Sequence, residues 1–319
     1  MRQAGRILPQ YRAIRSSLSG FIELVTTPDL VAEVTIQPVD ELDVDAAIIF
    51  SDILVIPECM GLDYEMIEKK GPFFPRTIQS ENDIDNLDSG KSAAEKLDYV
   101  FQGLDITKKE LNDRVPLIGF SGAPFTLFCY MIEGSGSKTF SKAKRMLYQN
   151  PTAAHKLLSK LTDTIIEYTK LKAAHGADVI QIFDSWAGVL DQRMYKEFCI
   201  PYLKKINDAL QAEDIPTIIF SKGAWFSLAD IANIHSNVIG IDWNMSPSFV
   251  REVLGGRLIQ GNLDPCVLYA SEDEIRSKAT AMMEAFGGNQ IVNLGHGVYP
   301  DTPLDGVKAF VNTVKEYKY

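Results

Sequence analysis

The strongest constraint on the fold is a series of short apolar runs that recur along the chain between longer helical patterns. The runs are β-branched or aromatic, have the length of strands, and are apolar throughout instead of alternating with polar residues. Strands that are buried on both faces of a parallel sheet have this pattern. Seven such runs occur, at residues 46–50, 117–120, 179–183, 217–220, 238–241, 258–260 and 291–294.

Helix signals lie between these runs. Asn150 and Pro151 form a cap followed by a first-turn proline, and the apolar spacing after them predicts a helix that ends at Gly176. Ser271 begins a capping-box pattern for a second helix, which we expect to end near Gly287. The strands and helices therefore alternate along the chain.

Strand–helix repetition builds either an open doubly wound sheet or a closed (β/α)8 barrel. A barrel needs an eighth strand, and the only place for it is the extreme N-terminus, where the chain begins abruptly at Met1. We therefore expect that the first strand is very short, that the chain is truncated, or that the start of the chain is misassigned. No linker, repeat or low-complexity segment divides the chain, so we expect one α/β domain over residues 1–319.

Composition limits the classes of function. The 319 residues are 46% hydrophobic, which is ample for a large core, and no apolar run approaches the roughly 18 residues of a membrane-spanning helix. The absence of a signal peptide and four widely spaced cysteines predict reduced thiols in the cytoplasm. The net charge of −10 disfavours a nucleic-acid partner, and an anionic substrate requires a local cationic cleft.

The N-terminal segment has the composition of such a cleft. Arg2 and Arg6 flank Gln3, Ala4 and Gly5, so two planar guanidinium forks border a small, flexible pair of residues. This pattern suits a clamp for a polyanion. The alternative is a solvated N-terminus with two ordinary surface arginines.

The apolar runs end in polar side chains. In a barrel, the carboxyl ends of all strands converge on one mouth, where active sites lie. Each of these polar segments taken alone is also typical of a helix cap, but the convergence of so many segments on one mouth favours a functional site among them. They are Ser51-Asp52, Ser121-Gly122, Asp184-Ser185, Ser221-Lys222-Gly223, Asp242-Trp243, and the segments 261–264 and 295–297, the last with His296 between two glycines.

Eight segments resemble the uroporphyrinogen decarboxylase family of heme biosynthesis, in the same order along nearly the whole chain. The resemblance implies a single (β/α)8 barrel, usually a homodimer, which uses no cofactor or metal. It also implies conversion of the four acetate side chains of uroporphyrinogen III to methyls, giving coproporphyrinogen III and carbon dioxide. The segments are MRQAGR (1–6), IIFSDIL (48–54), GPFFP (71–75), GAPFTL (122–127), YMIEG (130–134), FDSWA (183–187), QGNLDP (260–265) and NLGHG (293–297).

The same resemblance implies roles for individual residues. Arg2 and Arg6 match the carboxylate-binding arginines, and Gln3, Ala4 and Gly5 match the rest of that substrate loop.

Further positions match on the strand ends and beyond. Asp52 resembles the aspartate that faces the pyrrole NH groups, and Tyr130, Ser185 and His296 match other substrate-contacting positions. Phe183 would offer apolar surface to the macrocycle, although a strand residue of this kind is equally typical of simple core.

The chemistry requires an electron sink, because an acetate beside a pyrrole loses carbon dioxide only when the ring accepts the electrons. Protonation of a ring carbon creates that sink, and the Asp52 carboxylate would stabilise the resulting cation. The proton donor stays open between two residues. The resemblance favours Arg2, whereas the ordinary pKa of an imidazole, about 6.5, favours His296.

Two rival functions remain at this stage. A corrinoid- or zinc-dependent methyltransferase of the same barrel superfamily would need a thiolate–zinc site, and Cys266 has no nearby histidine. A non-catalytic tetrapyrrole carrier would keep the arginines but would not need Asp52. The glycine-rich residues 134–139 lack the Gly-Lys pair of a phosphate loop, and we expect them to lead into a helix from Lys138.

Overall fold

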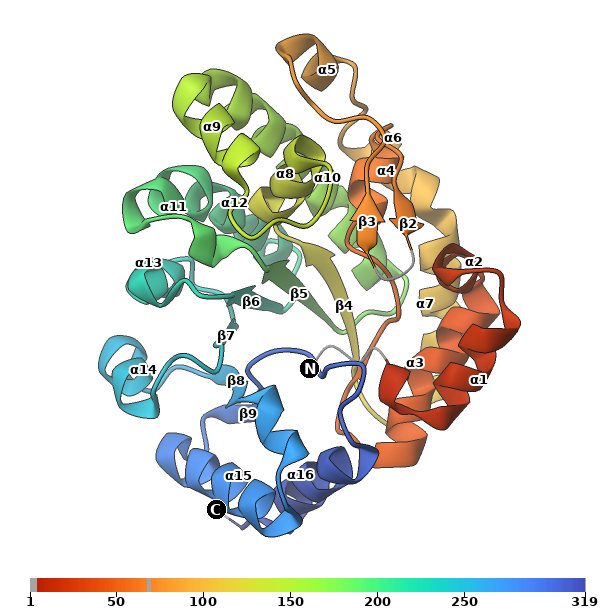
Figure 1. Cartoon of the computed structure of the whole chain (residues 1–319), viewed down its shortest axis with the longest axis vertical. Helices are drawn as coiled ribbons and strands as arrows, with labels where there is room; N and C mark the ends of the chain where they lie inside the picture. The colour runs from red at the N-terminus through yellow and green to blue at the C-terminus, as the bar shows by residue number, and fades with distance from the viewer. Residues whose placement is uncertain (1–4, 68–69, 319) are drawn as a thin grey trace.

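The computed structural model describes residues 5–67 and 70–318. A curled sheet of parallel strands forms its centre, and helices cover the outside of the sheet (Figure 1). The strand order is β1-β4-β5-β6-β7-β8-β9, and all neighbours are parallel. The strands are β1 (Ala47–Ile48), β4 (Leu117–Gly122), β5 (Val179–Asp184), β6 (Thr217–Ser221), β7 (Val238–Gly240), β8 (Ile259–Leu263) and β9 (Gln290–Leu294).

All seven apolar runs are thus confirmed as strands, and helices follow them as the sequence predicts. The helices before β5 are α1 (Pro9–Ser17), α2 (Phe21–Thr26), α3 (Pro28–Leu42), α4 (Val55–Cys59), α5 (Glu81–Asp85), α6 (Lys91–Ala94), α7 (Asp98–Leu111), α8 (Pro124–Glu133), α9 (Ser141–Gln149) and α10 (Pro151–Ala174). Those after it are α11 (Gln192–Phe198), α12 (Ile200–Gln211), α13 (Leu228–Ala232), α14 (Pro247–Leu254), α15 (Glu272–Phe286) and α16 (Leu304–Glu316). Short 3-10 turns are η1 (Gly5–Ile7), η2 (Glu95–Leu97), η3 (Ala187–Val189), η4 (Trp225–Ser227) and η5 (Pro265–Tyr269).

The edges of the sheet, β1 and β9, are not paired with each other within residues 5–67 and 70–318. The eighth strand expected at the N-terminus falls in a part of the chain outside the described residues. A cavity of about 610 Å³ lies where the strands begin, lined by residues of β1, β9 and α16 such as Ile48, Ile291 and Phe310. The described part of the barrel is therefore an arc of seven strands.

The predicted helix caps are confirmed. Asn150 Oδ1 accepts a hydrogen bond from Ala153 N at 3.1 Å, and α10 ends just before Gly176, which has a φ of +101°. Ser271 Oγ accepts from Glu274 N at 3.4 Å, and α15 ends at its C-cap Gly287.

Two local expectations differ from the structure. The helix expected from Lys138 begins at Ser141, because Ser137 Oγ accepts hydrogen bonds from Thr139 N and Phe140 N and holds a turn before the helix. A small antiparallel hairpin, β2 (Glu65–Ile67) and β3 (Gly71–Phe73), bridges to Ser135, which follows α8, and it was not among the elements expected from the sequence.

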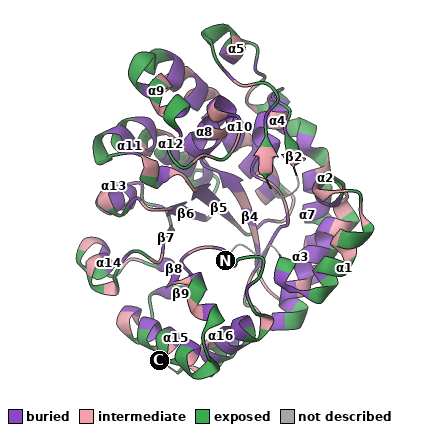
Figure 2. Ribbon diagram, in the orientation of Figure 1, coloured by how far each residue is buried: buried purple, intermediate pink, exposed green. Residues whose placement is uncertain are grey.

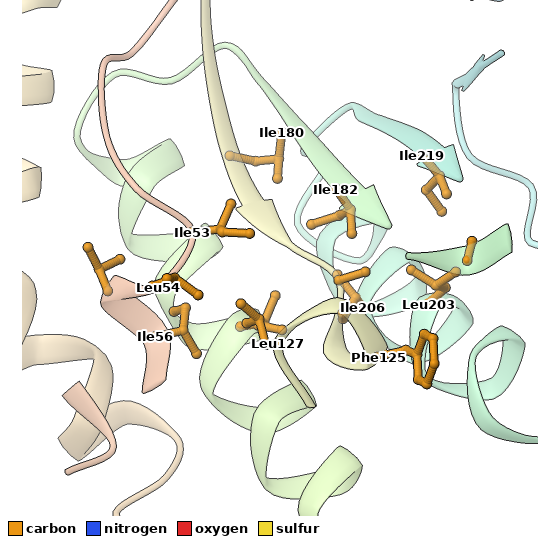
Figure 3. Packing of buried hydrophobic residues seen from close by; sticks show 14 of the residues in the cluster. Ile53, Leu54, Ile56, Phe125, Leu127, Ile180, Ile182, Leu203, Ile206 and Ile219 are labelled. Atoms are coloured by element: carbon orange, nitrogen blue, oxygen red, sulfur yellow. The ribbon is translucent and has the colours of Figure 1, made fainter. Parts of the chain in front are cut away.

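One core runs from η1 to α16, since a single cluster of buried side chains extends from Ile7 to Val311. The helices turn their buried faces toward the sheet and their exposed faces outward (Figure 2). Ile53 lies beside Leu127 of α8 in this core (Figure 3). Both side chains pack directly against Gly122, so the segment after β1 packs on the end of β4. No described helix has the length and apolar character required to cross a membrane.

Candidate active site

The carboxyl ends of neighbouring strands are joined by hydrogen bonds, which forms a connected rim. Ala123 N donates to Phe183 O at 2.9 Å, and Gly295 N donates to Leu263 O at 2.7 Å. Lys222 N, after β6, donates to the last carbonyl of β5 at 3.0 Å. The rim residues are therefore positioned by one another as well as by their own strands.

Two of the strand-end carboxylates belong to this scaffold. Asp184 is fully buried and its Oδ1 accepts from Thr126 Oγ1 at 2.8 Å, and burial raises its pKa to about 6. Asp242 is also fully buried and accepts from the backbone N–H groups of Gly223 and Asn244. Asp184 links the end of β5 to α8, and Asp242 links two neighbouring loops, so we assign both to the architecture of the rim instead of to substrate.

The interior of the barrel presents an apolar cluster to the rim. Ile48, Phe183 and Phe220 form a buried group separate from the main core, with Ile118 and Phe120 packed against it. Phe183 makes edge-to-face contacts with Phe120 and Phe220, at ring-centre distances of 5.8 and 6.0 Å. Phe183 therefore lies in a small apolar cluster that is separate from the main core.

Ser185 and His296 are brought together by the fold. Both line a cavity of about 30 Å³ at the ends of β5, β6 and β9, together with Phe183 and Phe220. His296 is half-buried and packs edge-to-face on Trp243 at a ring-centre distance of 5.9 Å. The cavity thus combines an aromatic wall with a hydroxyl and an imidazole.

Tyr130 lies close to Ser185 through an aromatic contact. It projects from α8, and its ring centre is 6.0 Å from that of Trp186, the residue after Ser185, and 6.2 Å from that of Phe140. The Tyr130 side chain is half-buried, so one part packs on the rim while another reaches solvent.

Asp52 follows β1 at the other side of the rim. Its Oδ1 accepts a hydrogen bond from Leu54 N at 2.9 Å, which fixes the carboxylate against the turn that begins α4. The Asp52 side chain is half-buried. Nearby Glu58 has a raised pKa, caused first by burial and then by the negative charges of Asp63 and Asp52.

The arginine clamp is described only in part. Arg2, Gln3 and Ala4 lie outside the described residues, and Gly5 begins η1. Arg6 is exposed.

Of two further cations, Arg15 is the one that was not singled out from the sequence. Arg15 of α1 and Arg6 both lower the pKa of the Tyr11 hydroxyl, against a larger raising effect of burial, and Tyr11 packs on Phe50 just before Ser51-Asp52. Arg15 therefore acts on the Tyr11 hydroxyl as Arg6 does, and no motif signals it.

Lys222 is the second cation. Its Nζ lies 5.8 Å from the centre of the Trp186 ring and 5.9 Å from that of Trp243. The position of Lys222 at the end of a predicted strand was the available signal, and the two tryptophans place its ammonium group at the rim.

The match to a protein-family model decides the family of the chain. Residues 1–317 match the model described as "Uroporphyrinogen decarboxylase (URO-D)". The chain belongs to the uroporphyrinogen decarboxylase family.

Individual members of the family align over almost the entire chain. The uroporphyrinogen decarboxylase of Chlorobium phaeobacteroides is 49% identical over 99% of this chain and 92% of its own length. Those of Dictyostelium discoideum and Christiangramia forsetii are 45% and 44% identical, and the matches cover 88% and 93% of their lengths.

A solved structure supports the barrel architecture of this uroporphyrinogen decarboxylase family member. A methyltransferase from Methanosarcina mazei superposes with a TM-score of 0.81 over 93% of this chain and 87% of its own chain. Its sequence identity is 21%, so the likeness is one of fold alone.

Proposed function

We propose that this chain is a carboxy-lyase that removes carbon dioxide from the four acetate side chains of uroporphyrinogen III, without a cofactor, and yields coproporphyrinogen III. The observation that carries the proposal is the family match over residues 1–317, together with an aromatic-lined barrel mouth bordered by cations. A hydrophobic tetrapyrrole with eight carboxylates needs both features in one site.

In the proposed mechanism, each cycle begins with protonation of a pyrrole carbon beside an acetate. The carbon–carbon bond to the carboxylate then breaks, its electrons neutralise the ring cation, and carbon dioxide leaves. A proton then adds to the exocyclic methylene group, which becomes the methyl, and the ring carbon loses its extra proton. Asp52 accepts hydrogen bonds from the pyrrole NH groups and stabilises the cation.

The other residues bind and orient the substrate in this proposal. Arg2 and Arg6 hold peripheral carboxylates, with Gln3, Ala4 and Gly5 as the rest of the loop. Tyr130, Ser185 and His296 contact further carboxylates, and a cation such as Lys222 adds charge at the rim. Phe183 and its aromatic neighbours receive the apolar ring.

The proton donor is Arg2 or His296, and pH–rate profiles of Arg2→Lys and His296→Asn distinguish them. If His296 is the donor, His296→Asn loses rate and the alkaline limb of its profile changes, because an imidazole ordinarily loses its proton near neutrality and can then no longer donate it. If His296→Asn keeps both rate and profile, His296 only binds substrate and Arg2 becomes the candidate.

Turnover of uroporphyrinogen III tests the function directly. The reaction is run anaerobically under reducing conditions with EDTA, and the products are separated as oxidised porphyrins. Stepwise appearance of hepta-, hexa-, penta- and tetracarboxylate species is expected. Activity that EDTA abolishes and zinc restores would favour the methyltransferase-like alternative, and binding without release of carbon dioxide would favour a carrier.

We further propose a cytoplasmic homodimer that uses no nucleic-acid or membrane partner. The family resemblance supports the dimer, and all four cysteines are free thiols, as a reducing compartment maintains them. Sedimentation equilibrium is expected to give twice the chain mass of 35.5 kDa. A mass equal to one chain would contradict the dimer.

A further inference from the structure

Lys172, in α10, is a lysine with no exposure to solvent. Within the described residues no carboxylate lies within ion-pair distance of it, and burial lowers its pKa to about 7. Its Nζ donates a hydrogen bond to Phe120 O at 2.8 Å and lies 4.4 Å from the centre of the Tyr168 ring. Burial of an amine away from water is costly, so this contact needs a structural reason.

The reason lies in the pairing of β1 with β4. The ladder runs from Ala47 N to Pro116 O at 2.9 Å and from Ile49 N to Ile118 O at 3.0 Å. The next bond of a parallel ladder would join Ser51 N to Phe120 O. That carbonyl accepts from Lys172 instead, so the lysine occupies the acceptor at the point where the two strands separate.

The chain after β1 changes direction where the two strands separate, and it then leads to Asp52. Lys172 reaches between the diverging strands, since its Nζ also lies 4.8 Å from the centre of the Phe120 ring, whose side chain faces the barrel interior. The Tyr168 hydroxyl, one turn earlier on α10, and the Ser51 hydroxyl are both buried without a hydrogen-bond partner among the described residues. Lys172 is therefore the α10 side chain whose hydrogen bond acts on the backbone just before the Ser51-Asp52 segment.

We propose that Lys172 is a positioning residue for decarboxylation: by donating to the Phe120 carbonyl, it holds β1 away from β4 and fixes the backbone course that orients the Asp52 carboxylate. This inference rests on the role proposed above for Asp52. Without the amine, Phe120 O has no donor, and the Ser51 backbone can close onto β4 to satisfy it. The Asp52 carboxylate would then move out of its position.

The test compares Lys172→Met, which removes the donor, with Lys172→Gln, which retains an uncharged one. We expect Lys172→Met to lower kcat by about tenfold to a hundredfold with KM changed less than about threefold, and Lys172→Gln to recover most of the rate. Lys170→Met, on the same helix but with a half-buried side chain that pairs with Glu213, is the matched control and should leave kcat unchanged. Circular dichroism and thermal unfolding establish that each variant is folded.

A double-variant comparison separates this proposal from the role of Asp52. If Lys172 acts through Asp52, adding Lys172→Met to Asp52→Asn lowers kcat by less than about a further twofold. A folded Lys172→Met with wild-type kcat, or an undiminished loss in the Asp52→Asn background, overturns the positioning role. If the Met variant does not fold, a folded Lys172→Gln with a kcat reduced more than about tenfold overturns it as well.

Failure of the underlying function gives a different result. Wild-type protein that does not convert uroporphyrinogen III removes the proposed reaction itself. Asp52→Asn with wild-type kcat removes Asp52 from the mechanism, and the positioning role of Lys172 with it.

Discussion

Asp52 carries the largest share of the proposed chemistry at the residue scale. Its carboxylate is held by Leu54 N and is half-buried, so it is oriented before any substrate arrives. We expect Asp52→Asn to lower kcat by about a hundredfold to a thousandfold, because one preorganised charge-stabilising group contributes roughly that factor. Steady-state turnover measures this, with thermal unfolding as the control. A near-normal kcat would contradict the assignment.

Asp184 gives a pH-dependent prediction for stability. Burial raises its pKa from 3.8 to about 6, so the folded protein holds this proton more tightly than the unfolded chain does. The free energy of unfolding therefore falls as the pH rises through the interval between these two values and stays reduced above it, by an amount on the order of 3 kcal/mol.

Asp184→Asn should remove this dependence while keeping an acceptor for Thr126. Urea unfolding at about pH 4.5, 5.5 and 6.5 is expected to show the variant gaining stability over the wild type as pH rises. A difference that is constant with pH would show that Asp184 does not titrate in this range.

The connection from β9 to His296 is tightly constrained at the element scale. A Cβ at Gly295 would lie 2.3 Å from Trp243 N and 2.8 Å from Trp243 Cα, so only glycine permits this approach of two backbones. We expect Gly295→Ala to lower the free energy of unfolding by about 1–3 kcal/mol or more and to displace His296.

Denaturant unfolding and kcat/KM measure these two effects of Gly295→Ala. Gly288→Ala is the matched control, because a Cβ there meets no atom within 4 Å. The control should change stability by no more than about 0.5 kcal/mol. Equal effects of the two substitutions would refute the close-packing argument.

At the element scale, the strands and helix caps were predictable from the sequence, whereas the length of β1 was not. The runs of buried strand residues and the caps at Asn150 and Ser271 were predictable because they depend on residues a few positions apart. The short β1 was not predictable in length, because its end is set by Lys172 and Thr35, which come from two different helices.

At the scale of the whole molecule, the continuous core predicts one cooperative unit. A single buried cluster from Ile7 to Val311 joins the first described element to the last helix. We expect one thermal unfolding transition whose calorimetric and van't Hoff enthalpies agree. Two resolved transitions, or a stable proteolytic half, would show that the chain is divided into domains.

The sequence alone was sufficient for the seven strands and the set of strand-end side chains, because the pattern of buried residues is a local property, whereas the barrel class came from the resemblance of eight ordered segments to a known family. It was not sufficient to separate scaffold from site among those side chains. All four of these residues follow or end a strand, and only the tertiary contacts show that Asp184 and Asp242 bond to other parts of the rim whereas Ser185 and His296 line a cavity. Tertiary structure also decided the places of Arg15, Lys222 and Lys172, because the environment of a cation depends on which elements pack around it.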